Sequence, residues 1–164
     1  MPYKRTDAPL SALPQSPGDP VDFRMRRNVP ITKHQRTILS ISAVADDHAS
    51  LRRILCDQLW QIVIASNYTE AVACLCRDRV DVVACERHLP DGTWKDLLGH
   101  IAEMLDPPVL IVTSEVADPH FRDGVRALGG YDVITKPFDA KEVRRLLATA
   151  DLNRASEAEA LVHT

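Results

Sequence analysis

The chain has 164 residues, of which 45% are hydrophobic, with a formal net charge of −3 and a pI near 6.0. This size suits one domain with a real core and some tail. The weak acidic charge gives no electrostatic reason to expect nucleic acid or a membrane as the main partner. The sequence has no apolar run that could span a bilayer or serve as a signal peptide, so we expect a cytoplasmic protein.

Residues 1–36 contain six prolines, scattered charges and no apolar periodicity. We predict a disordered, Pro-rich and basic tail. Its cluster Arg24-Met25-Arg26-Arg27 is expected to be solvated, although docking on an acidic partner or on nucleic acid is the alternative. Residues 151–164 are polar and rich in Ala and Glu, and we predict a helical extension or tail there.

Residues 37–150 alternate between short strand-like runs and amphipathic helical runs. The predicted strands are Ile38–Val44, Gln61–Ala65, Val80–Cys85, Val109–Thr113 and Tyr131–Thr135. Each is followed by a helical segment, and such repeats with short loops predict a parallel sheet covered on both faces. We therefore predict a three-layer α/β fold of the doubly wound, flavodoxin-like kind, with strand order 2-1-3-4-5.

Three polar residues sit where a predicted helix begins. Asn67, Asp118 and Asp139 each precede a helical run and can accept a hydrogen bond from its first turn. These signals set the starts of the second, fourth and fifth helices.

The cysteines and the scattered histidines carry no recognisable metal-ligand spacing. We expect all four cysteines to be reduced core residues: Cys56, Cys74, Cys76 and Cys85. Three single histidines fall on predicted loops or helix surfaces, where we expect them to be solvated: His48, His88 and His100.

Acids, a hydroxyl and a lysine follow different strands of the predicted sheet but meet at one edge of it. They are Asp46, Asp47, Glu86, Thr113 and Lys136. The carboxyl ends of the strands are where ligands bind in open α/β sheets. Carboxylates bind Mg²⁺, and a hydroxyl and an ammonium group bind phosphate oxygens, so this set predicts a site for a cation and a phosphoryl group.

The same residues make residues 37–150 resemble a response-regulator receiver domain of two-component signalling. The motifs that carry the resemblance are Asp46-Asp47 with Leu51-Arg52-Arg53-Ile54-Leu55, Asp81-Val82-Val83 with Glu86 and Leu89-Pro90-Asp91-Gly92, Val109-Leu110-Ile111-Val112-Thr113, and Lys136-Pro137-Phe138. The resemblance implies five parallel strands, a cis peptide before Pro137, and a switch surface on the fourth helix, fifth strand and fifth helix.

Two positions depart from the family pattern. In the family an aspartate attacks a phosphohistidine donor, with Mg²⁺ held by the acid pair and that aspartate, but the matching residue here is Glu86. Its extra methylene carries the carboxylate toward the space of the phosphoryl group. The family's aromatic switch residue is replaced by Val133, while Tyr131 is placed on the same face of an alternating strand.

Two registers are open for the first strand. If it ends at Ala45, Asp46 and Asp47 enter the site and can hold Mg²⁺ together with Glu86; the spacing to the following helix favours this register. If it ends near Ser42, an acid caps the helix instead and the site loses negative charge.

We therefore expect a stand-alone, atypical receiver without enzymatic activity of its own. It would bind a regulatory protein, either a histidine kinase or a downstream effector, without phosphorylation, with Glu86 mimicking a phosphorylated aspartate and meeting Lys136 and Thr113. A homodimer through the switch surface is a further option. The alternatives are residual Mg²⁺-dependent phosphoacceptor chemistry, a flavodoxin-like small-ligand binder, and nucleic-acid binding by the tail.

Overall fold

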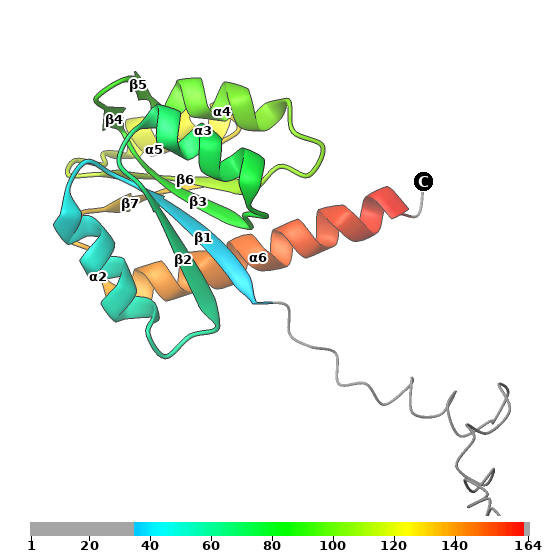
Figure 1. The fold of residues 1–164 in the computed structure, drawn as a ribbon, viewed down its shortest axis with the longest axis horizontal. Coiled ribbons are helices and arrows are strands. Elements are labelled where there is room, and N and C mark those ends of the chain that lie inside the picture. The colour runs from blue at the N-terminus through cyan, green and yellow to red at the C-terminus, as the bar shows by residue number, and fades with distance from the viewer. Residues whose placement is uncertain (1–34, 163–164) are drawn as a thin grey trace, which may run out of the picture. The chain divides into compact units, whose positions relative to one another are not determined.

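The computed structural model describes residues 35–162. Residues 1–34 of the predicted tail 1–36 and residues 163–164 lie outside this range, whereas Arg36 belongs to the first strand rather than to the tail. The strands are β1 (Arg36–Ile41), β2 (Trp60–Ala65), β3 (Val82–Glu86), β4 (His88–Leu89), β5 (Gly92–Thr93), β6 (Val109–Ser114) and β7 (Asp132–Thr135). The helices are α2 (Ala45–Leu55), α3 (Tyr68–Arg77), α4 (Trp94–Ala102), α5 (Pro119–Leu128) and α6 (Ala140–Val162) (Figure 1).

Five strands form one parallel sheet in the order β2-β1-β3-β6-β7. This confirms the predicted 2-1-3-4-5 order, because β4 and β5 form a separate antiparallel hairpin just after β3. The Lys136–Pro137 peptide is cis, as the family resemblance implied.

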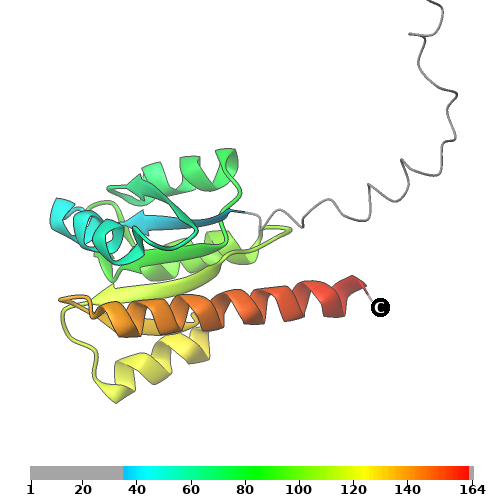
Figure 2. The same cartoon turned by 90° about the horizontal axis from the view of Figure 1, so that it is seen from below.

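Helices cover both faces of the sheet (Figures 1 and 2). Helices α2 and α6 pack on one side around Ile38, Ile111 and Leu147. On the opposite side, α3, α4 and α5 pack around residues such as Leu39 and Leu97. Successive strand residues alternate between the two clusters, which is the reason the central strands read as continuous apolar runs.

The first strand is shorter than predicted. It ends at Ile41, so the favoured register ending at Ala45 is wrong and the chain turns at Ser42. The Ser42 hydroxyl accepts a hydrogen bond from the backbone N–H of Val44 (3.0 Å), which starts the turn into α2. His48 then lies between the Ser40 hydroxyl (2.8 Å) and the Ser42 carbonyl (3.0 Å), and holds α2 against β1.

This role of His48 corrects a second expectation. Its side chain is buried, with 7% of its surface exposed, rather than solvated. Because Nε2 donates to a carbonyl oxygen, Nδ1 is left to accept from the Ser40 hydroxyl, which makes His48 a structural link between a strand and a helix.

Only half of the cysteine prediction is correct. Cys74 and Cys85 are buried, whereas Cys56 and Cys76 are exposed, and all four are free thiols. Cys56 lies beyond the end of α2, and Cys76 is two positions from Cys74 on α3, a spacing that turns it to the other face of the helix.

The predicted helix starts are confirmed by hydrogen bonds. Asn67 accepts from the backbone N–H of Glu70 (2.8 Å) and Asp118 from that of Phe121 (2.7 Å). Asp139 accepts from the N–H of Lys141 (2.9 Å) at the start of α6.

Helix α6 continues without a break from Ala140 to Val162. Its second half is tied to the amino-terminal edge of the sheet, because Arg154 pairs with Asp81 and with Asp106 (2.8 Å) and Asp151 pairs with Arg36 (2.6 Å). Within residues 35–162, no helix has both the length and the apolar character needed to cross a membrane.

Helix α5 is fastened to the sheet by a buried carboxylate. Asp132, at the start of β7, has 9% of its side chain exposed and pairs with Arg122 (3.2 Å) and Arg126 (3.0 Å) of α5. Arg122 also approaches Glu142 of α6 at 4.0 Å. The ion pairs therefore fix where α5 lies along the sheet.

We predict that Asp132→Ala lowers the free energy of unfolding by about 1 to 3 kcal/mol, because it removes a buried carboxylate that pairs with Arg122 and Arg126 and accepts from the backbone N–H of Val133. Urea unfolding measures this change. Asp123→Ala is the matched control, since Asp123 is exposed on α5, the helix that carries both arginines, and it should change stability by less than about 0.5 kcal/mol. Equal effects of the two substitutions would contradict the assigned role of Asp132.

Candidate functional site

The carboxyl edge of the sheet carries a lysine bound to two carboxylates. Lys136 follows β7, and its Nζ lies 2.7 Å from Oδ2 of Asp47 and 2.8 Å from Oε1 of Glu86. Asp47 comes from the first turn of α2 and Glu86 from the end of β3. The three side chains are 11%, 14% and 21% exposed, so the ion pairs are shielded from most of the solvent.

A serine completes this group. The Ser42 hydroxyl lies 2.6 Å from Oδ2 of Asp47 and 3.1 Å from Oε2 of Glu86. We call these four residues, Ser42, Asp47, Glu86 and Lys136, the acid–lysine site. Each carboxylate thus contacts the same ammonium group and the same hydroxyl.

Sequence reasoning did not find Ser42. The signal that could have found it is the strand register, because Ile41 pairs with Cys85 and places Ser42 beside Glu86 at the edge of the sheet. That register depends on where β1 ends, which local sequence left open.

The two predicted acids are separated. Asp47 enters the acid–lysine site, whereas Asp46 is exposed on the first turn of α2 and has no hydrogen bond or ion pair among residues 35–162. Neighbouring residues on a helix point about 100° apart, so a helical first turn cannot aim both carboxylates at one point.

The residues present do not fit the magnesium site that the resemblance implied. Mg²⁺ needs a near-octahedral set of oxygen ligands. At the end of β1, Ser42 offers only a neutral hydroxyl as a ligand. The Asp47 and Glu86 carboxylates both pair with the Lys136 ammonium. In the described part of the chain, no three Asp, Glu, His or Cys side chains converge on a point that a metal ion could occupy.

The two switch positions of the family, a hydroxyl residue and an aromatic residue, also differ from the expected arrangement. Thr113 is buried and pairs with Glu86 in the β3–β6 register, but its hydroxyl has no hydrogen-bond partner in residues 35–162. Val133 packs in the core on the α3–α5 side of the sheet, while Tyr131 packs with the cluster on the α2–α6 side. The expectation that these two share a face is wrong, because β7 begins only at Asp132.

The electrostatics follow from burial and pairing. Burial would lower the pKa of Lys136, but the hydrogen bonds and charges of Asp47 and Glu86 outweigh it and leave that pKa above its usual value. Burial, and then the charge of Glu86, raises the pKa of the neighbouring Cys85 thiol to about 12. Cys85 is therefore a protonated core residue at neutral pH and supplies no nucleophile to the site.

The loop after Glu86 is anchored to a neighbouring helix. Asp91, in the turn between β4 and β5, accepts hydrogen bonds from the backbone N–H groups of Tyr68 (2.6 Å) and Thr69 (3.0 Å) and from the Thr69 hydroxyl (2.7 Å). The helix dipole at the start of α3 favours this carboxylate. The hydroxyl of Thr69, followed by these N–H groups, lowers the pKa of Asp91.

We predict that Lys136→Met lowers the free energy of unfolding at neutral pH by about 2 to 4 kcal/mol, because two partly buried carboxylates lose the one cation that pairs with them within residues 35–162. The pKa of Lys136 is raised on folding, so its contribution is complete below the ordinary value of 10.5 and is lost as pH rises through the folded-state pKa. Urea unfolding from neutral to alkaline pH measures both effects. The exposed Lys141→Met is the control, and an equally large loss there would contradict the assignment.

The anchoring of the loop gives a second prediction, at acid pH. Because the pKa of Asp91 is lowered in the folded state, its contribution is present above the ordinary value of 3.8 and disappears as pH falls through the folded-state pKa. Asp91→Asn should therefore unfold at lower urea concentration than wild type at neutral pH, and the two curves should converge in acid. Asp46→Asn should match wild type throughout, and a gap between Asp91→Asn and wild type that persists in acid would count against the mechanism.

Comparison with known proteins agrees with this geometry. The family model described as response regulator receiver domain matches residues 43–148. The response regulator protein PilR of Pseudomonas aeruginosa is 31% identical over 121 residues, which cover 71% of this chain and 27% of PilR. The probable transcriptional regulatory protein TcrX of Mycobacterium tuberculosis is 35% identical over 105 residues, covering 61% of this chain and 44% of TcrX.

The curated relatives are longer proteins, of which this chain spans about a quarter to a little over a half. The fold is matched by the signal receiver domain of an HD domain-containing protein from Pseudomonas fluorescens Pf-5, with a TM-score of 0.71 at 24% identity, covering 80% of this chain and 98% of that one. The sheet order, the lysine followed by a cis proline, and the family match over residues 43–148 lead to one conclusion: the chain belongs to the response regulator receiver family of two-component signalling.

Proposed function

We propose that this receiver acts in two-component signalling without being phosphorylated, by binding a regulatory protein. The observation that carries the proposal is the pairing of Lys136 with the Glu86 and Asp47 carboxylates at 2.8 and 2.7 Å. The lysine that would hold a phosphoryl oxygen already has two anionic partners of its own.

Glu86 is poorly placed to act as a nucleophile. Its oxygens are already paired, Oε1 with the Lys136 ammonium (2.8 Å) and Oε2 with the Ser42 hydroxyl (3.1 Å), and an attacking oxygen would have to give up part of this pairing. The extra methylene also advances the carboxylate into the space that an incoming phosphoryl group needs, and in-line attack is sensitive to displacements of about 1 Å.

The site also has fewer acidic side chains that could act as metal ligands for phosphoryl transfer. A receiver of the usual kind needs a divalent cation to neutralise the charge that the transferred group brings. Here Ser42 offers a neutral hydroxyl, and Asp46 points to solvent. This donor set supports a site whose two carboxylates pair with Lys136 rather than with a metal ion.

Glu86 can substitute for part of a phosphorylated aspartate. It presents a negative charge to Lys136 at hydrogen-bond distance, as an acyl phosphate would, but makes no hydrogen bond to Thr113 among the described residues. We propose that this holds the domain in one state, with no enzymatic activity of its own. A kinase or a downstream effector would then read that state, and the α5–β7–α6 face is the surface for such a partner or for a homodimer.

The proposal predicts that the wild type gains no phosphoryl mass after incubation with Mg²⁺ and phosphoramidate, as measured by intact-protein mass spectrometry. Glu86→Asp alone should also stay unmodified, because Ser42 supplies no metal ligand at the end of β1. The double variant Ser42→Asp/Glu86→Asp restores an acid at both positions, and we expect it to gain one phosphoryl group.

The competing function is residual Mg²⁺-dependent phosphoacceptor chemistry, since the Asp47 and Glu86 carboxylates do face one site. A phosphoryl group on the wild-type protein would establish that competing function and contradict the function we propose. Repeating the incubation with EDTA separates metal-dependent transfer from non-specific modification.

A further inference from the structure

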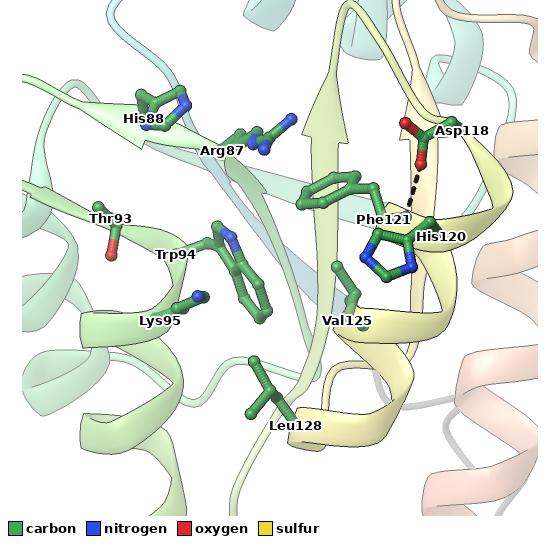
Figure 3. A pocket seen from close by; sticks show the side chains of 11 residues that line it. Arg87, His88, Thr93, Trp94, Lys95, Asp118, His120, Phe121, Val125 and Leu128 are labelled. Carbon is green, nitrogen blue, oxygen red and sulfur yellow. Dashed lines mark hydrogen bonds between the residues drawn. The ribbon is translucent and has the colours of Figure 1, made fainter.

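A groove between α4 and α5 lies outside the acid–lysine site (Figure 3). Its volume is about 410 Å³, and its lining includes Arg87, Trp94, Lys95, Phe121, Gly124 and Leu128. We call it the α4–α5 groove. Its volume falls in the range of sites that accept a small molecule or one or two side chains of a partner.

The floor of the α4–α5 groove is apolar. The rings of Trp94 and Phe121 meet edge to face with centroids 6.3 Å apart, and Val125 lies beneath them. Leu128 forms one end of the groove and keeps 56% of its surface exposed. An exposed apolar residue continuous with an aromatic floor favours contact with an apolar group of a partner.

The two cations of the groove lack counter-ions. Arg87 places its guanidinium carbon 4.0 Å from the centre of the Phe121 ring, and Lys95 places its Nζ 5.9 Å from the centre of the Trp94 ring. Neither side chain has a hydrogen-bond or ion-pair partner within residues 35–162. The described residues include 14 Lys and Arg against 20 Asp and Glu, so the domain is acidic, and the groove brings two cations without counter-ions next to an apolar floor.

A phosphate ligand does not fit this groove. Phosphates are usually bound at free helix N-termini, and both helices that border the groove begin beside it. The Asp118 carboxylate already caps α5 by accepting from Phe121 N–H (2.7 Å), and Thr93 and Asp96 form a capping box at the start of α4. Both helix starts therefore lack free N–H donors for a phosphate, whereas Arg87 and Lys95 have no counter-ion among residues 35–162 and can pair with carboxylates.

We propose that the α4–α5 groove binds an acidic peptide segment of a partner protein. A bulky apolar side chain of that segment would lie on Phe121 and Leu128, and its carboxylates would pair with Arg87 and Lys95. This is a different surface from the α5–β7–α6 face, so the inference goes beyond the proposed function.

The groove is joined directly to the acid–lysine site. Arg87 follows Glu86 in the chain, its backbone N–H donates to the Thr113 carbonyl at 3.0 Å, and its side chain stacks on the first turn of α5. A peptide that binds and shifts the Arg87 side chain would therefore shift the end of β3, where Glu86 lies.

The test starts from a random peptide library displayed on phage and selected on the full-length protein without any phosphodonor. We expect the enriched peptides to carry Asp or Glu next to Leu, Phe or Trp. Synthetic, fluorescein-labelled copies then give affinities by anisotropy. With ¹⁵N-labelled protein, the indole signal of Trp94 should shift on binding, and that of Trp60, which lies on β2, should not.

A pair of glycine variants provides the sharpest control. Gly124 lines the groove and Gly99 is on α4 outside it, and an added Cβ would meet no atom within 4 Å at either helical position. Gly124→Leu should fill the groove and weaken peptide binding by at least about tenfold, whereas Gly99→Leu should bind as wild type does. Thermal unfolding should show that neither variant is less stable than wild type, because both remove a helical glycine.

The charge requirement is tested by Arg87→Met, which keeps an apolar contact on Phe121 but removes the cation. We expect it to weaken binding about tenfold, with Arg145→Met, an exposed arginine of α6, as the unchanged control. The inference is overturned if the enriched peptides are neutral or basic, if none is enriched, if inorganic phosphate or ATP competes for the groove, or if Gly124→Leu binds as well as wild type. Binding through the basic residues 1–34 would give that last result. A failure here leaves the outcome of the phosphoramidate experiment untouched.

Discussion

The carboxyl edge of the sheet is held together by one cation, Lys136, which two carboxylates share. Lys136 pairs with one carboxylate from α2 and one from β3, and the Ser42 hydroxyl at the end of β1 joins the same two carboxylates. Three strand ends and a helix start therefore meet in one network at the carboxyl edge of the sheet. Two carboxylates, one ammonium and one hydroxyl leave a local charge of about −1, and each carboxylate pairs with the Lys136 ammonium at 2.7 to 2.8 Å without a metal ion.

The overall topology could be predicted because it rests on patterns that local sequence encodes. Apolar runs such as Val109–Thr113, caps such as Asp118, and the right-handed rule for parallel connections suffice to order the strands. The positions of Glu86 and Lys136 followed from that order. The end of β1 could not be predicted, since Ala43-Val44-Ala45 continues the apolar pattern of the strand and only the distant contact of His48 with Ser40 and Ser42 decides where the helix starts.

The remaining errors have the same origin. Whether Tyr131 shares a face with Val133 depends on the first residue of β7, and the exposure of Cys76 depends on which face of α3 meets the sheet. Such one-residue differences move a side chain from one surface to another while the element stays in place. Ser42 was missed for this reason, although it contacts both carboxylates of the site.

Serine at position 42 and glutamate at position 86 are best understood together. An acid in place of Ser42 would put a third carboxylate around one ammonium group, and such a cluster calls for a divalent cation. With serine there, a hydroxyl with one proton to donate lies 2.6 Å from the Asp47 carboxylate and 3.1 Å from that of Glu86, and the Glu86 carboxylate pairs with Lys136 directly. In the function we propose, these two residues together remove the need for the cation and the room for the phosphoryl group. Signalling would then come from surfaces that a partner can reach, and the contact of Arg87 with the Phe121 ring lies on one such surface, directly after Glu86 in the chain.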